Sequence, residues 1–147
     1  MIILDTNVLS ETFKQNPDKN VIEWLDFQKP TDLYITTITL AEMEFGMFCL
    51  PNGKRRDALF EAINGSRTVE FQGRILPFNE QSSLFYGKWM ALARSSGKAV
   101  SQSDGMIAAI AIAAANCTVA TRDVSPFLAM GVKVVNPWKS GEILKPG

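Results

Sequence analysis

Apolar residues follow two alternating patterns along this chain. Short runs of about four residues are typical of strands that are buried on both faces of a parallel sheet. Between these runs, apolar residues recur every three or four positions, which is typical of one buried helix face. The runs predict strands at residues 2–5, 33–36, 74–77, 118–121 and 132–135.

The segments between the strands predict helices, in most cases two between consecutive strands. Proline and glycine mark their limits: Pro17 breaks the first helix, Pro51 and Gly53 separate two others, and Gly97 ends the longest. Helices are expected from about residue 6, at 20–28, from Thr37 or Thr39 to 49, and at 54–65, 79–95 and 105–115, with one more between the last two strands.

This alternation of strands and helices predicts an α/β fold. We expect a three-layer α/β/α sandwich, with helices on both faces of a central, mainly parallel sheet of four to five strands. A chain of 147 residues suffices for one domain with a hydrophobic core, and no linker or repeat interrupts it. We expect a domain at residues 1–138 and a C-terminal tail at 139–147.

Composition indicates an ordinary globular protein of the cytoplasm. Hydrophobic residues make up 46% of the chain, and no apolar stretch is long enough to span a bilayer. Asp5 interrupts the N-terminal apolar run, and the start lacks the basic segment of a secretory signal. Cys49 and Cys117 both lie in apolar surroundings, which predicts buried free thiols.

The absence of histidine narrows the chemistry more than any other feature of composition. It excludes Ser-His-Asp and Cys-His catalysis, histidine acid–base chemistry and histidine-ligated zinc, and two distant cysteines cannot form a zinc site. An enzyme with this composition would use carboxylates, with a hard metal ion. Net charge is zero, and the cluster Lys54–Arg56 is more consistent with a solvated helix face than with a phosphate-binding track.

Three aspartates are placed where a parallel sheet gathers functional groups. Asp5 ends the first strand, Asp104 opens the helix that leads into the fourth strand, and Asp123 follows that strand by two residues. These positions meet at the carboxyl edge of the sheet, where α/β proteins bind ligands. Each aspartate also has a structural explanation, because Asp5 and Asp104 are good helix caps and aspartate is common in turns.

Glu42 is the fourth candidate. Its helix is apolar nearly all round, and its neighbours Ile38, Phe45 and Gly46 carry no charge. An unpaired buried carboxylate is costly, so Glu42 should have a partner about one turn from the same sheet edge. Glu44 lies about 200° away around the helix, and periodicity alone does not choose between the two acids.

Carboxylates gathered in this way need a counter-charge. Two charges about 4 Å apart repel by roughly 4 kcal/mol at an effective dielectric near 20. Mg²⁺ or Mn²⁺ would relieve this repulsion, orient a phosphodiester and lower the pKa of an attacking water. Four polar neighbours are expected to hold the carboxylates through hydrogen bonds: Thr6, Asn7, Ser103 and Thr121.

Four segments of the chain resemble the signatures of PIN-domain ribonucleases. They are Ile3-Leu4-Asp5-Thr6-Asn7, Thr39-Leu40-Ala41-Glu42, Ser103-Asp104-Gly105-Met106-Ile107-Ala108-Ala109 and Ala120-Thr121-Arg122-Asp123. The chain is more closely similar to VapC toxins of type II toxin–antitoxin systems, especially the FitB-like branch, which shares Leu76-Pro77-Phe78 and Asn136-Pro137-Trp138. The resemblance extends over about residues 1–138.

This resemblance implies a PIN-like fold and a Mg²⁺-dependent endoribonuclease, with Mn²⁺ as a substitute, that cleaves RNA with a metal-activated water. Asp5 and Asp104 match the principal metal ligands, Glu42 matches the third acid and is favoured over Glu44, and Asp123 matches the fourth. Many relatives have asparagine there and an acid slightly later, but Val124, Ser125 and Pro126 follow here. The resemblance further implies a homodimer and a cognate DNA-binding antitoxin that obstructs the site, with no membrane partner.

Other enzymes with an aspartate after the first strand fit less well. Aspartyl-nucleophile phosphatases have a second aspartate two positions later, where this chain has Asn7, and phospho-receiver domains need an acidic pair that is missing here. A related PIN-type nuclease acting on DNA would use the same metal chemistry, although the chain has little room for a DNA-clamping insert. A non-catalytic PIN interaction module would tolerate loss of the acids, and all four are present.

Overall fold

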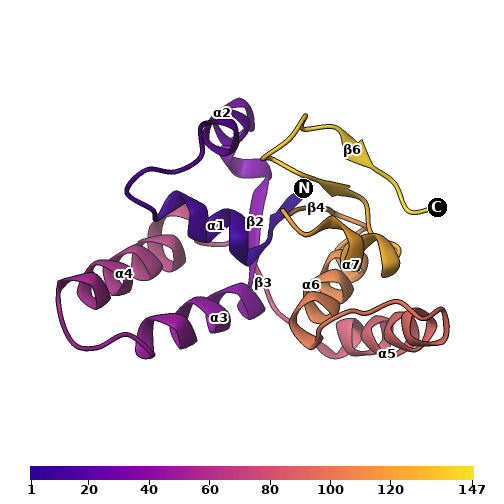
Figure 1. The fold of residues 1–147 in the computed structure, drawn as a ribbon. Coiled ribbons are helices and arrows are strands. Elements are labelled where there is room, and N and C mark those ends of the chain that lie inside the picture. Colours follow the sequence, from indigo (N-terminus) through magenta and orange to yellow (C-terminus); the bar gives the residue numbers. More distant parts are fainter.

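A six-stranded sheet lies at the centre of the molecule, with helices packed on both faces (Figure 1). The computed structural model describes residues 1–147. The spatial order is β3-β2-β1-β4-β5-β6, and every neighbouring pair is parallel except β5 and β6. The strands are β1 (Ile2–Leu4), β2 (Leu33–Thr36), β3 (Ile75–Leu76), β4 (Thr118–Ala120), β5 (Val134–Val135) and β6 (Ile143–Leu144).

Seven α-helices cover the sheet. Helices α1 to α4 share one apolar cluster with Leu4 and Ile35, and α6 and α7 share a second with Ile3 and Val119 on the other face. The helices are α1 (Thr6–Thr12), α2 (Lys19–Phe27), α3 (Thr37–Phe48), α4 (Lys54–Gly65), α5 (Glu80–Ser95), α6 (Gln102–Ala113) and α7 (Val124–Ala129). Alternate residues of β1 therefore enter opposite cores, as expected for a strand that is buried on both faces.

Strand register brings the predicted acidic positions to one edge of the sheet. Leu4 pairs with Ala120, so β1 and β4 end side by side, and Asp5 and Thr121 directly follow these two residues. The backbone N–H of Asp5 donates to the carbonyl of Ala120 at 2.9 Å. Helices α1 and α7 begin close to this edge, and α6 returns the chain into β4.

Helix α6 lies very close to α5, and a glycine permits the approach. A Cβ atom on Gly105 would stand 2.6 Å from the sulfur of Met90. The alanine-rich sequence that follows buries Ile107, Ala108 and Ile110 almost completely. The first turn of α6 contains Asp104, and the charge of Asp104 acts on that of Asp5 at the carboxyl edge of the sheet.

The predicted α/β sandwich and the order of its elements are confirmed, with local differences. The sheet has six strands because Ile143–Leu144 pairs antiparallel with β5, inside the segment predicted as a tail. Gly141, with a φ of 71°, reverses the chain there, and two residues are too few to show a periodic pattern. The division into residues 1–138 and a tail remains a prediction.

The cysteine prediction was partly wrong. Both cysteines are free thiols and Cys117 is buried, but Cys49 is exposed. Cys49 is the C-terminal capping residue of α3, where that helix leaves the core, so an apolar sequence neighbourhood did not lead to burial. None of the helices combines the length and the apolar character needed to cross a membrane.

Candidate active site

Asp5 is the most buried acid at the carboxyl edge, with 4% of its surface exposed. Its Oδ1 accepts the N–H of Thr6 at 2.8 Å, and its Oδ2 accepts the hydroxyl of Thr121 at 2.7 Å. Asp5 is also the N-cap residue of α1. Capping and a central place in the site are therefore combined in one side chain.

The environment of Asp5 disfavours its negative charge. The pKa of Asp5 is raised from 3.8 to about 6. Burial is the main cause, the hydrogen bonds from Thr121 and Thr6 oppose the rise, and the charges of Asp104 and Glu42 add to it. A carboxylate held in this way attracts a proton or a cation more strongly than an exposed one.

Asp104 lies in the first turn of α6 but does not cap it. Ser101 is the N-cap, and its hydroxyl oxygen accepts the backbone N–H of Asp104 at 3.2 Å. The capping explanation for Asp104 was therefore wrong, and its half-buried carboxylate is available for another role. Burial raises the pKa of Asp104, the charges of Asp123 and Glu42 add to the rise, and Ser101 lowers it.

Glu42 lies beside Asp5, although not for the reason expected from the sequence. The side chain is exposed, because α3 is covered on one side only and leaves Phe45 72% exposed. Its Oε1 accepts the hydroxyl of Thr6 at 2.6 Å. Glu44 instead forms an ion pair with Arg67 at 2.6 Å, so the structure places Glu42 and not Glu44 at the site.

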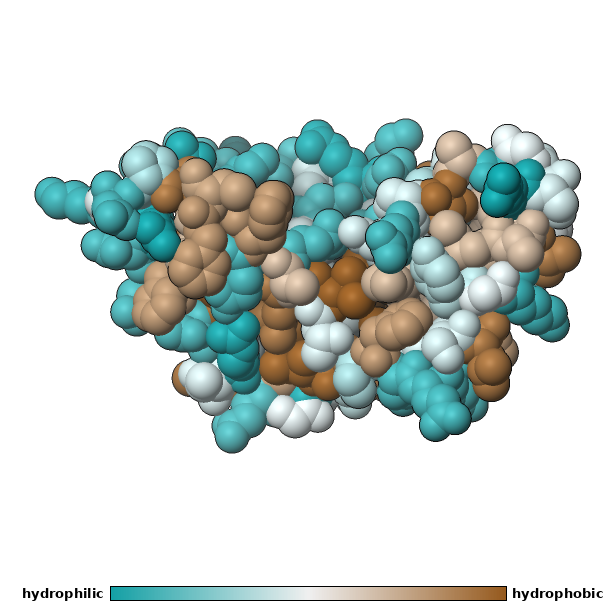
Figure 2. All heavy atoms as spheres, turned by 90° about the horizontal axis from the view of Figure 1, so that it is seen from below, coloured by the Kyte–Doolittle hydropathy of each residue, from teal (hydrophilic) through white to brown (hydrophobic).

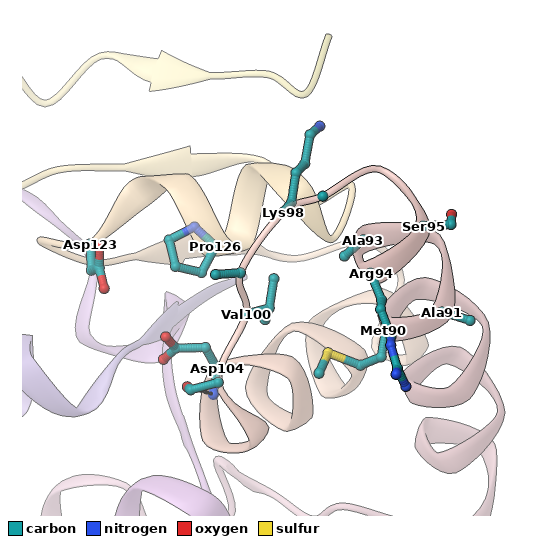
Figure 3. Close-up of a pocket in the computed structure, with 13 residues that line it drawn as sticks. Met90, Ala91, Ala93, Arg94, Ser95, Lys98, Val100, Asp104, Asp123 and Pro126 are labelled. Atoms are coloured by element: carbon teal, nitrogen blue, oxygen red, sulfur yellow. Dashed lines mark hydrogen bonds between the residues drawn. The ribbon is translucent and has the colours of Figure 1, made fainter.

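Asp123 completes the set from the end of β4. It occupies the N-cap position of α7 without a side-chain capping bond, and its backbone N–H donates to the hydroxyl of Thr121 at 3.0 Å. Asp123 and Asp104 line one groove of about 1300 Å³ that runs along α5 and the following loop. Figure 3 shows both carboxylates at one end of this groove, with Pro126 nearby and Lys98 extending away from them.

A second groove opens on the other side of Glu42, between α3 and α6. It measures about 580 Å³ and includes Ile38, Phe45 and Met106 in its lining. Figure 2, a view from below onto the side of α3 and α5, shows apolar side chains around a hollow in this face. Glu42 therefore stands at the border between this apolar groove and the acidic edge.

Comparison with known proteins identifies the chain at this point. The PIN domain profile matches residues 2–131, nearly the whole of the described fold. This chain belongs to the PIN-domain family. It is 45% identical to VapC ribonuclease Y4jK of Sinorhizobium fredii over 95% of this chain and 99% of that protein, and 43% identical to Toxin FitB of Neisseria gonorrhoeae over 94% and 99%.

Solved structures agree with the sequence relationship. A chain in the structure of FitAB bound to an IR36 DNA fragment superposes with a TM-score of 0.89 at 42% identity, over 97% of this chain and 99% of that one. The chain is therefore a member of the VapC toxin group, close to FitB, and several proteins of this group that it resembles are named ribonucleases. The resemblance carried by the four sequence signatures is confirmed.

The four acids of this PIN domain lie around one edge of the sheet without forming a compact cluster. No group of three or more acidic or thiol side chains is close enough together to hold a metal ion. Asp5 is fixed by two hydrogen bonds, Glu42 is exposed and bonded to Thr6, and Asp123 is exposed with no side-chain capping bond. The donor set consists of oxygen atoms only, which suits a hard divalent cation.

Of the four polar neighbours expected to hold the acids, two bond directly to a carboxylate. Thr6 and Thr121 donate to Glu42 and Asp5, Asn7 donates to the Thr121 hydroxyl at 3.4 Å, and Ser103 makes no side-chain hydrogen bond. Sequence reasoning missed Thr39, whose hydroxyl lies 3.1 Å from that of Thr6 and which is fully buried. A fully buried threonine needs a hydrogen-bond partner, but burial was not readable from the sequence.

Proposed function

We propose that this PIN domain is a Mg²⁺-dependent endoribonuclease and the toxin of a type II toxin–antitoxin pair. The observation that carries the proposal is that four carboxylates, from four separate segments, lie around one sheet edge of a chain without histidine, with the charges of Asp104 and Glu42 acting on Asp5 and those of Asp123 and Glu42 acting on Asp104. The names of its relatives, a VapC ribonuclease and Toxin FitB, support the proposal.

Asp5, Asp104, Glu42 and Asp123 would hold the ion. Their chemistry fits this role, because burial and mutual repulsion raise the pKa of both Asp5 and Asp104, and a cation would offset the excess negative charge. When bound, Mg²⁺ would lower the pKa of an attacking water and neutralise charge on the phosphodiester.

The chain's own residues would orient the substrate and take up protons. Thr6 and Thr121 hold the Asp5 carboxylate in one orientation through hydrogen bonds to both of its oxygens. Asp104 faces a groove open to water, and its raised pKa makes the carboxylate a suitable proton acceptor. Because the chain has no histidine, carboxylates are the acid–base groups that the site can offer.

We also propose that this PIN domain binds a cognate DNA-binding antitoxin and forms a homodimer. The related FitAB complex was solved bound to DNA, which supports a DNA-binding partner. Exposed apolar side chains on α3 and α5, including Phe45, Phe48 and Leu84, provide surface of the kind that protein partners cover.

Cleavage of single-stranded RNA by the purified chain tests the catalytic proposal. Cleavage should require Mg²⁺ or Mn²⁺, stop when EDTA is added and be lost in Asp5→Asn, while Asp26→Asn on the exposed side of α2 should retain it. Cleavage that persists in EDTA, or full activity of Asp5→Asn, would contradict the metal mechanism. Single-stranded and flap DNA in parallel reactions would detect a DNA nuclease, and no cleavage of any substrate would indicate an interaction module.

Expression in bacteria tests the toxin role separately. The wild-type chain should arrest growth, Asp5→Asn should not, and co-expression of a small adjacent gene for a DNA-binding protein should restore growth. Normal growth with the active nuclease would contradict the toxin role and leave the nuclease proposal standing. Sequencing of RNA 5′ ends shortly after induction would identify the cleaved RNA.

A further inference from the structure

Thr6 contacts two of the four acids with its two hydrogen-bond donors. Its backbone N–H donates to Asp5 at 2.8 Å, and its hydroxyl donates to Glu42 at 2.6 Å. The two acids come from different elements, β1 and α3, and Thr6 is the first residue of α1. For the exposed Glu42, the Thr6 hydroxyl is the only side-chain partner.

The hydroxyl of Thr6 also belongs to a longer chain of threonines. Its single proton goes to Glu42, because an ionised carboxylate only accepts hydrogen bonds. The 3.1 Å contact between Thr6 and Thr39 must then be donated by Thr39. Thr39 in turn accepts the hydroxyl of Thr36 at 3.5 Å, and its own backbone N–H donates back to Thr36 at 3.1 Å.

These contacts form a directed chain from Thr36, the N-cap of α3, through Thr39 and Thr6 to the carboxylate of Glu42. Thr36 and Thr39 are both fully buried, so neither hydroxyl can exchange its partner for water. Hydrogen bonds that point the same way polarise one another and strengthen the last bond of the series. The exposed end of Glu42 is therefore held by a buried network that originates on its own helix.

We propose that Thr6, supported by Thr39, is a positioning residue that holds Glu42 in place for the divalent cation of the site. The inference rests on the proposed metal-dependent function and names residues that supply no ligand themselves. Hydrogen-bond partners of metal ligands commonly account for a 10–100-fold effect on metal affinity. Loss of the Thr6 hydroxyl should therefore weaken metal binding without removing a ligand.

Mn²⁺ affinity of the purified chain, measured by electron paramagnetic resonance, tests the proposal independently of RNA cleavage. Thr6→Val should bind Mn²⁺ about 10-fold more weakly or worse. Thr6→Ser should stay close to wild type, and Thr39→Val should show a smaller loss in the same direction. The matched control is Thr12→Val, on the same helix, where the hydroxyl donates to the Leu9 carbonyl away from the site.

The same Thr6 substitution, made in a Glu42→Ala protein, distinguishes positioning of Glu42 from a general loosening of the fold. If Thr6 acts through Glu42, Thr6→Val should cause no further loss of Mn²⁺ affinity in the Glu42→Ala protein. Equal affinity of Thr6→Val and wild type, or the same fold-loss in both backgrounds, would overturn the positioning role while the proposed function stands. Failure of the wild-type chain to bind Mn²⁺ would overturn the metal-dependent function, and the positioning role with it.

Discussion

Replacement of Asp5 by asparagine should stabilise the fold at neutral pH while it abolishes cleavage. The burial of this carboxylate raises its pKa from 3.8 to about 6, a difference equivalent to about 3 kcal/mol at neutral pH, because one pKa unit is about 1.4 kcal/mol. Asparagine occupies nearly the same volume and carries no charge, so the folded protein no longer has to bury an ionised group.

Changes in the hydrogen bonds of Asp5 offset part of this stabilisation. The side-chain oxygen of asparagine can still accept the Thr6 N–H, which bonds to Oδ1 at 2.8 Å. The Thr121 hydroxyl, which donates to Oδ2 at 2.7 Å, would face an amide donor and lose its acceptor. That loss costs about 1 kcal/mol, so Asp5→Asn should gain a net 2 kcal/mol or so above pH 7.

The stabilisation of Asp5→Asn relative to wild type should increase with pH. Because the folded pKa is raised, wild-type Asp5 contributes stability that is fully present below pH 3.8 and is lost as pH rises through about 6. Relative to wild type, Asp5→Asn should therefore be equal or slightly less stable near pH 4 and more stable near pH 7.5. The change in relative stability should occur between these values.

Urea unfolding followed by circular dichroism, at several pH values from 4 to 7.5 in EDTA, measures this difference. Acids remote from Asp5 affect both proteins alike and cancel in the comparison, whereas Asp104 and Glu42 interact with the Asp5 charge and contribute to the measured difference. A stability difference that stays constant across this pH range would refute the reasoning, and so would a variant that is less stable than wild type at pH 7.5. Either result would mean that Asp5 ionises in the fold without the burial cost inferred from its contacts.

Three further outcomes follow from the same site. Mg²⁺ or Mn²⁺ at about 100 times its dissociation constant should stabilise the wild-type chain by about 2.7 kcal/mol in thermal unfolding, and equal stabilisation of Asp5→Asn would place the ion elsewhere. Glu42→Gln should reduce the rate of RNA cleavage by about 10-fold or more. Glu44→Gln, which removes only the ion pair with Arg67, should cleave RNA at close to the wild-type rate. Equal reductions of the cleavage rate in the two variants would contradict the assignment of Glu42. Thr121→Val should destabilise the fold by about 1–3 kcal/mol at pH 7.5, and by less near pH 4, where Asp5 is protonated. Urea unfolding at both pH values measures the difference. An equal loss of stability at both pH values would argue against a role of Thr121 in holding the charged form of Asp5.

Most of the architecture could be predicted from the sequence because its signals are local. The strand at Leu33–Thr36 and the helix at Lys54–Gly65 have the predicted bounds, since apolar spacing and nearby turn residues mark them directly. The place of Asp5 at the end of a buried strand was equally local. A strand of two residues, such as Ile143–Leu144, carries too little pattern to be recognised and forms only because β5 offers an open edge.

The sequence by itself indicated that Asp5, Asp104 and Asp123 lie at the carboxyl edge, because alternating strands and helices predict parallel strands whose carboxyl ends share one edge. The tertiary structure alone decided how they are held. Glu42 differs from Glu44 only through contacts with residues distant in the chain, Thr6 in one case and Arg67 in the other. Side-chain exposure and hydrogen-bond direction depend on such packing between elements, and no spacing along a single helix contains that information.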